Sequence, residues 1–176
     1  GALGLLSAYQ LALAGCQVCV LERCRVGREA SWAGGGIVSP LYPWRYSPAV
    51  TALAHWSQDF YPGLARLLLE DTGVDPEVHV TGLYWLDLDD EAEALAWARR
   101  QGRELFAVDI AEAYQQVPVL GDGFKRAIHM PGVANVRNPR LVKALRAALA
   151  AMPNVELREH CPATGFIQEN GQIRGM

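Results

Sequence analysis

The sequence predicts an α/β fold, and its first 22 residues carry the evidence. Glycines stand at Gly1 and Gly4, an apolar stretch suited to a helix runs from Leu5 to Ala14, and a short β-branched strand ends at Glu22. In a Rossmann-like βαβ unit, glycines let the backbone approach a pyrophosphate, and the helix N-terminus offers N–H groups to its oxygens. Glu22 stands 21 residues after Gly1, close to the spacing of about 20 expected of a ribose-binding carboxylate.

This glycine motif lacks its beginning. The fingerprint G-x-G-x-x-G requires a glycine two places before Gly1 and a strand before that, and the chain starts without methionine. We therefore expect a piece of a longer protein whose first strand lies upstream. Gly1 and Gly4 alone would also fit an ordinary loop. The helix, the glycine stop at Gly15, the strand and Glu22 together favour the dinucleotide-binding unit.

Size and composition fit one globular domain or parts of two. The chain has 176 residues, 51% of them hydrophobic, and a formal net charge of −3 with both signs interspersed. This balance does not suggest a nucleic-acid or anionic-membrane partner. No apolar run approaches the roughly 20 residues of a membrane span. We expect a cytoplasmic protein.

The four cysteines do not predict a metal site. Cys16 and Cys19 have the C-x-x-C spacing, but Cys19 falls within the predicted strand, and no second pair of Cys or His completes a tetrahedral site. Free, mostly buried thiols in a reducing compartment are expected instead.

A small-residue run follows Glu22 and ends in three glycines, Gly34, Gly35 and Gly36. Consecutive glycines are costly in a helix or a strand, so we expect something bulky to lie against this backbone. Ser31 can offer a hydroxyl group to a phosphate. A flexible loop tip is the alternative interpretation.

Helical periodicity from Pro48 to Thr72 predicts an amphipathic region, which Pro62-Gly63 is expected to break into two helices. His55 within it is expected to be a packed or surface histidine. Asp89 is expected to cap a helix over 90–101, and Asn138 one that runs to about Met152. Strands are expected at 78–80, 83–87, 124–130, 133–136 and 155–158, and a hairpin pairs 163–168 with 172–176 across Glu169-Asn170-Gly171.

The Gly1-x-x-Gly4 turn, Glu22 and the run from Gly27 to Gly36 together resemble the opening of the D-amino-acid oxidase family of FAD-dependent oxidoreductases. Residues 31–45 resemble most the bacterial glycine oxidases of thiamine biosynthesis. The resemblance continues to the end of the chain, although members are about twice as long. It implies an FAD-binding domain over 1–75, part of an antiparallel-sheet substrate domain over 76–136, and a return to the FAD-binding domain over 137–176.

The resemblance also implies which residues contact FAD. Positions matching Ala2 and Leu3 contact the pyrophosphate, Glu22 takes the adenosine ribose, and Ala163 contacts the adenine through its backbone. The glycines at 34–36 depart from relatives that carry a larger residue such as methionine near the flavin. The implied set is Gly1, Ala2, Leu3, Gly4, Glu22, Arg23, Ala30, Ser31, Gly34, Gly35, Gly36 and Ala163.

The family reaction is hydride transfer from the Cα of a small amino acid to the flavin, followed by hydrolysis of the imine to an oxo acid and ammonia. Molecular oxygen then takes the electrons and yields hydrogen peroxide. Family members hold the substrate carboxylate with an arginine and a tyrosine of their C-terminal half. We therefore expect the catalytic residues beyond Met176 and assign no role to Arg45 or Arg137. The 176 residues by themselves are expected to be an inactive part of the enzyme.

Other interpretations stay open. The same fold serves sarcosine-oxidase-like enzymes and quinone-linked D-amino-acid dehydrogenases. A nicotinamide enzyme is also compatible, because Glu22 favours a free 2′-hydroxyl while Arg23 and Arg25 could receive a 2′-phosphate. A truncated, non-catalytic chain is a further alternative. The choice among glycine, sarcosine and small D-amino acids is open, as is a homo-oligomeric state.

Overall fold

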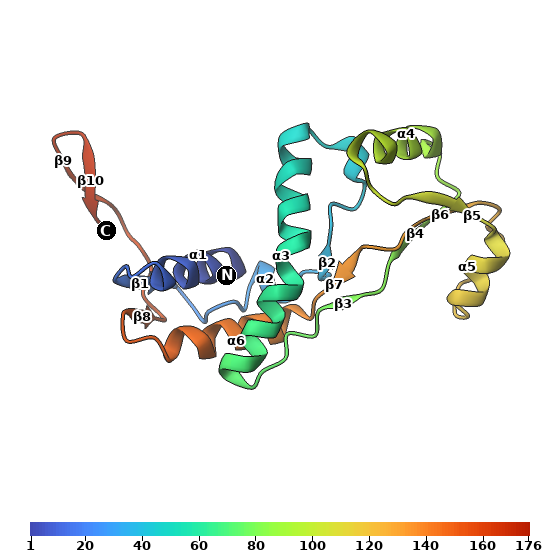
Figure 1. Ribbon diagram of the computed structural model, residues 1–176. Helices are drawn as coiled ribbons and strands as arrows, with labels where there is room; N and C mark the ends of the chain where they lie inside the picture. Colours follow the sequence, from blue (N-terminus) through green and yellow to red (C-terminus); the bar gives the residue numbers. More distant parts are fainter. The chain divides into compact units, whose positions relative to one another are not determined.

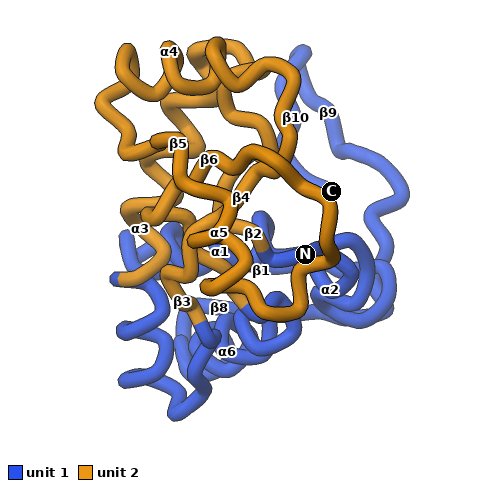
Figure 2. The backbone as a smooth tube through the Cα atoms, turned by 90° about the vertical axis from the view of Figure 1, so that its right-hand side faces the viewer, with its two compact units in different colours: residues 1–36, 63–77, 137–176 blue, residues 37–62, 78–136 orange.

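The computed structural model describes residues 1–176 and divides into two compact units. Unit 1 comprises 1–36, 63–77 and 137–176, and unit 2 comprises 37–62 and 78–136 (Figure 2). The roles of residues 1–75, 76–136 and 137–176 as cofactor and substrate domains stay a prediction. No helix is both long and apolar enough to span a bilayer.

Unit 1 contains a parallel strand pair accompanied by helices (Figure 1). Strands β1 and β8 pair in parallel, with Val18 opposite Val155. Helix α1 contacts α6 and β1, and α6 also contacts α2 and β8. Its elements are α1 (Ala2–Leu13), β1 (Val18–Leu21), α2 (Ala30–Ala33), α6 (Asn138–Ala150), β8 (Val155–Arg158), β9 (Ile167–Glu169) and β10 (Gln172–Gly175).

Apolar side chains at helical spacing explain these helices. In α6, Leu141, Leu145 and Leu149 recur every four residues and are fully buried, so one stripe of the helix is removed from water. Each such side chain contributes roughly 1.5–3 kcal/mol of burial free energy. After α1, Gly15 adopts the left-handed conformation with φ of +85°, which stops the helix as predicted.

Unit 2 contains two antiparallel sheets, ordered β2-β7-β3 and β4-β6-β5. Trp44, Trp85 and Trp97 are buried in its core together with Ile128 of β6. The rings of Trp44 and Trp85 meet edge-on with centroids 5.3 Å apart, a favourable aromatic geometry. Its elements are β2 (Ile37–Val38), η1 (Pro43–Arg45), β3 (His79–Val80), β4 (Leu83–Leu86), α4 (Glu91–Gln101), β5 (Phe106–Val108), α5 (Ile110–Gln116), β6 (Ala127–Met130) and β7 (Ala134–Asn135).

The mixed arrangement confirms the predicted α/β class, with a parallel pair in unit 1 and antiparallel sheets in unit 2. The hairpin is also confirmed: β9 pairs with β10 in antiparallel orientation. Its two turn residues, Asn170 and Gly171, have φ of +51° and +74°, as a tight hairpin turn requires.

The expected break at Pro62 is wrong, because α3 is a single helix over Pro48–Thr72 with Pro62 inside it. A proline in a helix interior costs about 3 kcal/mol. Leu64 and Leu68 follow on one stripe and are 2% and 0% exposed, and their burial offsets that cost.

Both predicted helix caps are also wrong. Helix α4 follows Asp90 rather than Asp89, and the Asp90 carboxylate accepts hydrogen bonds from Trp44 and Arg45 instead of capping the helix. Helix α6 has Arg137 at its N-cap and ends at Ala150, while the amide of Asn138 bonds elsewhere. For Asn138, a distant partner takes the place of the local cap.

The prediction of mostly buried thiols is wrong as well. Cys16, Cys19 and Cys24 are exposed, and Cys161 is half-buried. Cys19 lies on β1, whose only paired neighbour is β8, and Cys16 and Cys24 lie in the loops on either side of that strand. All four cysteines are free thiols.

Candidate cofactor site

Residues predicted to bind the cofactor meet at the start of α1. The Ala2 N–H donates to Ser31 Oγ at 2.8 Å, although 29 residues separate the two. The nitrogen of Gly1 lies 3.8 Å from Glu22 Oε2. A Cβ added to Gly1 would stand 2.8 Å from Ser31 Oγ. Because glycine has no Cβ, Ser31 can approach the backbone this closely.

The first turn of α1 has backbone donors without helical acceptors. The first i→i−4 bond runs from the Leu5 N–H to the Gly1 carbonyl at 3.1 Å, so the N–H groups of Leu3 and Gly4 precede the helical ladder. The N-cap residue is Gly1, which has no side chain that could bond to these N–H groups. Gly4 is exposed, and a Cβ there would meet no heavy atom within 4 Å, so no close packing against this chain requires a glycine at that position.

Glu22 is held at the end of β1 by its own backbone. Its N–H donates to the Arg158 carbonyl at 2.9 Å, and its carbonyl accepts from the Cys161 N–H at 2.9 Å. Its Oε1 accepts from the Cys24 N–H at 3.1 Å. This leaves Oε2 as the oxygen nearer to Gly1.

Three other residues predicted to contact the cofactor, Arg23, Ala30 and Ala163, form no hydrogen bond with Gly1, Glu22 or Ser31. Arg23 donates to Glu29 Oε1 at 2.7 Å, and this hydrogen bond raises the pKa of the exposed guanidinium. Ala163 is exposed two residues after Cys161, and Ala30 is exposed at the start of α2. Their places against a cofactor stay predictions.

The run Gly34–Gly36 is contacted by Asn138, which the sequence predicts to be a helix cap. Asn138 Nδ2 donates to the Gly34 carbonyl at 2.9 Å, and a Cβ at Gly34 would come within 2.6 Å of that nitrogen. Gly36 has a φ of +73°, which side-chain-bearing residues rarely adopt. Gly35 has open space around it. The Asn-Pro pair at Asn138 was the available signal, and it was interpreted as a cap.

The arginines left unassigned are engaged in ion pairs. Arg45 donates to Asp90 Oδ2 at 2.7 Å and stacks on Tyr42, and Arg137 lies 3.2 Å from Glu77. No group of three or more His, Cys, Asp or Glu side chains is placed to hold a metal ion.

The arrangement suits an adenosine diphosphate group. Unpaired N–H groups at a helix start attract phosphate oxygens, and the Glu22 carboxylate can accept hydrogen bonds from a ribose diol. The absence of a Cβ at Gly1 keeps the approach open. These donors and acceptors therefore fit the adenosine diphosphate half of FAD.

Comparison with known proteins agrees with this geometry. The family model described as DAO, FAD dependent oxidoreductase, matches residues 1–176. The chain is 72% identical over 176 residues to the glycine oxidase of Pseudomonas putida and 62% identical to that of Pseudomonas aeruginosa, covering 100% of this chain and 48% of each relative. The crystal structure of glycine oxidase from Bacillus cereus matches with a TM-score of 0.86 at 27% identity, over 98% of this chain and 47% of that one.

The chain thus spans about half the length of these relatives. The family model nevertheless covers every residue of this chain. The chain belongs to the DAO family of FAD-dependent oxidoreductases, in agreement with the resemblance in its sequence.

Proposed function

We propose that the protein oxidises glycine or similarly small amino acids and amines with FAD, producing an oxo acid, ammonia and hydrogen peroxide. The observation that carries this proposal is the 72% identity to a glycine oxidase along the whole chain. The proposal includes a place in thiamine biosynthesis and a cytoplasmic location, and both rest on the likeness to glycine oxidases alone.

The residues gathered at α1 would hold the nucleotide half of the cofactor. The N–H groups of Leu3 and Gly4 would donate to the pyrophosphate, and Glu22 would accept from the adenosine ribose. Ser31 supports this by fixing the Ala2 N–H at 2.8 Å. The remaining predicted contacts, Arg23, Ala30, Gly34, Gly35, Gly36 and Ala163, belong to the same proposal.

FAD supplies the difficult chemistry when it is bound, because its flavin accepts a hydride from the substrate Cα and passes the electrons to oxygen. Residues 1–176 would bind the cofactor and orient it. Ser31 and Asn138 do so by fixing backbone, the former at the start of α1 and the latter at Gly34. A rigidly placed cofactor keeps the geometry for hydride transfer within the narrow limits that efficient reaction requires. No residue of the chain is assigned a proton transfer.

The proposal is tested by the colour and the turnover of the purified complete protein, because the catalytic residues are expected beyond Met176. We expect a yellow protein with a flavin absorption spectrum, which consumes oxygen and releases one hydrogen peroxide for each glycine oxidised. Sarcosine and D-alanine, assayed in parallel, would define the substrate preference.

Three outcomes would contradict the proposal. Turnover with a quinone but without peroxide would indicate a dehydrogenase of the same fold. A colourless protein that responds to NAD or NADP would indicate a nicotinamide enzyme. A protein that retains neither cofactor would favour the non-catalytic alternative.

A further inference from the structure

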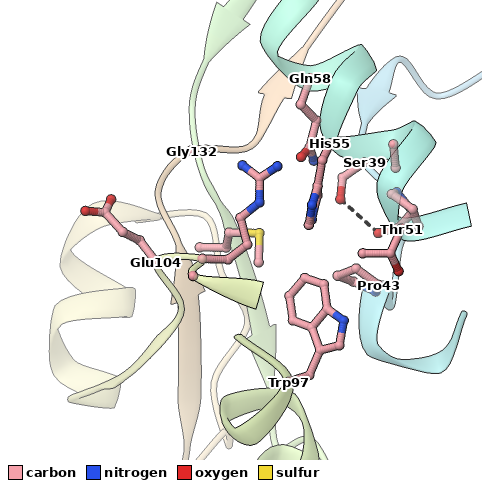
Figure 3. Close-up of a pocket in the computed structure, with 13 residues that line it drawn as sticks. Ser39, Pro43, Thr51, His55, Gln58, Trp97, Glu104 and Gly132 are labelled. Carbon is pink, nitrogen blue, oxygen red and sulfur yellow. Dashed lines mark hydrogen bonds between the residues drawn. The ribbon is translucent and has the colours of Figure 1, made fainter. Parts of the chain in front are cut away.

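Unit 2 contains a pocket of about 360 Å³ that has no part in the candidate cofactor site. Figure 3 shows His55 and Gln58 on one side of this pocket and Trp97 at its lower end. The volume lies within the range of about 300–1,000 Å³ typical of small-molecule sites. Ser39, Thr51 and Arg103 also line the pocket.

Arg103 is the cation of this pocket, and it is half-buried. None of the ion pairs in the structure involves it. Its backbone is fixed at the end of α4, where Gly102 is left-handed and the Arg103 N–H donates to the Ala98 carbonyl at 2.9 Å. Glu104, the next residue, also lines the pocket, but it forms no ion pair with Arg103, and Figure 3 shows its carboxylate pointing away from His55.

The other polar groups supply hydrogen bonds without adding charge. Burial lowers the pKa of His55, and the charge of Arg103 lowers it further against the opposing effect of Asp59; the imidazole is therefore neutral at neutral pH. Gln58 Nε2 donates to the Val38 carbonyl at 3.0 Å, which fixes its amide. Thr51 is 4% exposed.

Apolar groups form the remaining wall. Trp97 is 5% exposed and Met130 is 6% exposed, and both line the pocket together with Pro43. The ring of His55 lies 6.1 Å from that of Trp97. The lining thus contains one cation, Arg103, one exposed carboxylate, Glu104, neutral hydrogen-bonding groups and an apolar surface.

We propose that this pocket binds a small monocarboxylate, with the carboxylate paired to Arg103 and the hydrocarbon body packed against Trp97. A guanidinium presents a planar fork that matches a carboxylate, and no carboxylate of the chain is paired with Arg103. This inference rests on the lining of the pocket and not on the proposed oxidase activity.

The test compares isobutyrate with isobutyramide, which has nearly the same shape but no charge. Calorimetric titration of the unmodified protein should give saturable binding of isobutyrate with one molecule per chain. The amide should bind at least about tenfold more weakly, because a hydrogen bond to a charged group is worth more than a neutral one. Equal affinity for the two compounds, or no saturable binding of isobutyrate, would overturn the proposal.

Two arginine variants locate the site. Arg103→Gln should weaken isobutyrate binding by about tenfold or more, and Arg103→Lys should restore part of it because the charge returns without the fork. Arg100→Gln is the matched control, because Arg100 is exposed three residues away and does not line the pocket.

Equal losses in Arg103→Gln and Arg100→Gln would indicate a long-range charge effect, and unchanged binding in Arg103→Gln would place the carboxylate elsewhere. Either result overturns the assignment. Circular dichroism establishes that each variant is folded. Should Arg103→Gln not fold, the comparison of acid and amide on the unmodified protein, together with Arg103→Lys, still decides.

Discussion

The carboxylate of Glu22 has two oxygens in different situations. Oε1 accepts from the Cys24 N–H at 3.1 Å, while Oε2 is the oxygen that faces Gly1 at 3.8 Å. One oxygen therefore orients the side chain and leaves the other to a ligand. A sequence pattern can place Glu22 at the end of a strand, but only the fold shows this division.

In the complete protein, Glu22→Ala should raise the dissociation constant of FAD by roughly 10–100-fold, since hydrogen bonds to a charged group contribute about 1.5–3 kcal/mol. The fold should be retained, because the side chain is partly exposed and the strand is held by backbone hydrogen bonds. Flavin fluorescence on titration of the apoprotein measures the affinity. Glu70→Ala, which removes an equal charge from an exposed position of α3, should leave it unchanged; a Glu22 variant with normal affinity would refute the assignment.

Asp90 gives a prediction about pH. Hydrogen bonds from Arg45 and then from Trp44 lower the pKa of Asp90 to about 2. In the unfolded chain the Asp90 carboxyl has an ordinary pKa of about 4. The stabilisation of the folded state by the ionised carboxylate is therefore complete above about pH 4 and is lost as the pH falls towards 2. Asp90→Asn should therefore have a lower melting temperature at neutral pH.

The same variant should also lose less stability than the unmodified protein between about pH 4 and pH 2. Urea unfolding at several pH values measures both effects. Identical slopes in the two proteins would show that Asp90 has an ordinary pKa in the folded state.

At the scale of elements, Gly27 allows α6 to approach the loop after β1. Its φ is +71°, and an added Cβ would overlap a methyl group of Val142. Val142 is 3% exposed, and a β-branched side chain cannot turn away easily. A substitution at Gly27 therefore meets backbone strain and overpacking together.

Gly73→Ala separates these two costs, because Gly73 has a similar φ of +67° and nothing within 4 Å of an added Cβ. We expect Gly73→Ala to reduce the free energy of unfolding by about 1–3 kcal/mol through strain alone. Gly27→Ala should reduce the free energy of unfolding by a further amount of about 1–3 kcal/mol, because of overpacking. Chemical denaturation measures both, and equal losses would show that Val142 relaxes freely.

The elements that the sequence predicted well are those with local causes. The stop at Gly15 and the turn at Asn170-Gly171 each depend on residues within a few positions. The capping prediction at Asn138 failed because the amide bonds Gly34, 104 positions away. Asp90, the residue before α4, accepts from Arg45, 45 positions away, and does not cap that helix. A single sequence contains no local signal for such partners.

The candidate site divides in the same way. Its ingredients were predicted from spacing and resemblance, but the bond that joins Ser31 to Ala2 follows only from the tertiary fold. Helix α5 was not predicted, although Asp109 at its N-cap accepts from the Ala111 N–H at 2.9 Å. That capping signal was available in the sequence, yet seven residues are too few for a clear helical period.

At the scale of the whole molecule, cofactor binding and folding are linked. A ligand that binds only the folded state stabilises it by about 2.7 kcal/mol when present at a hundredfold excess over its dissociation constant. The donors at the start of α1 and the Glu22 carboxylate fit the adenosine diphosphate half of FAD rather than the flavin. The stability of the apoprotein should therefore report which half of the cofactor these residues hold.

We expect FAD and ADP each to raise the melting temperature of the apoprotein, with FMN much less effective at equal concentration because it lacks the adenosine and one phosphate. Glu22→Ala should reduce the shift given by FAD and by ADP alike, whereas Glu70→Ala should leave both shifts intact. Thermal unfolding followed by circular dichroism, which flavin colour disturbs little in the far ultraviolet, gives the comparison. If FMN stabilised the protein as well as FAD while ADP had no effect, the flavin half would dominate, and the nucleotide role assigned to α1 and Glu22 would be wrong.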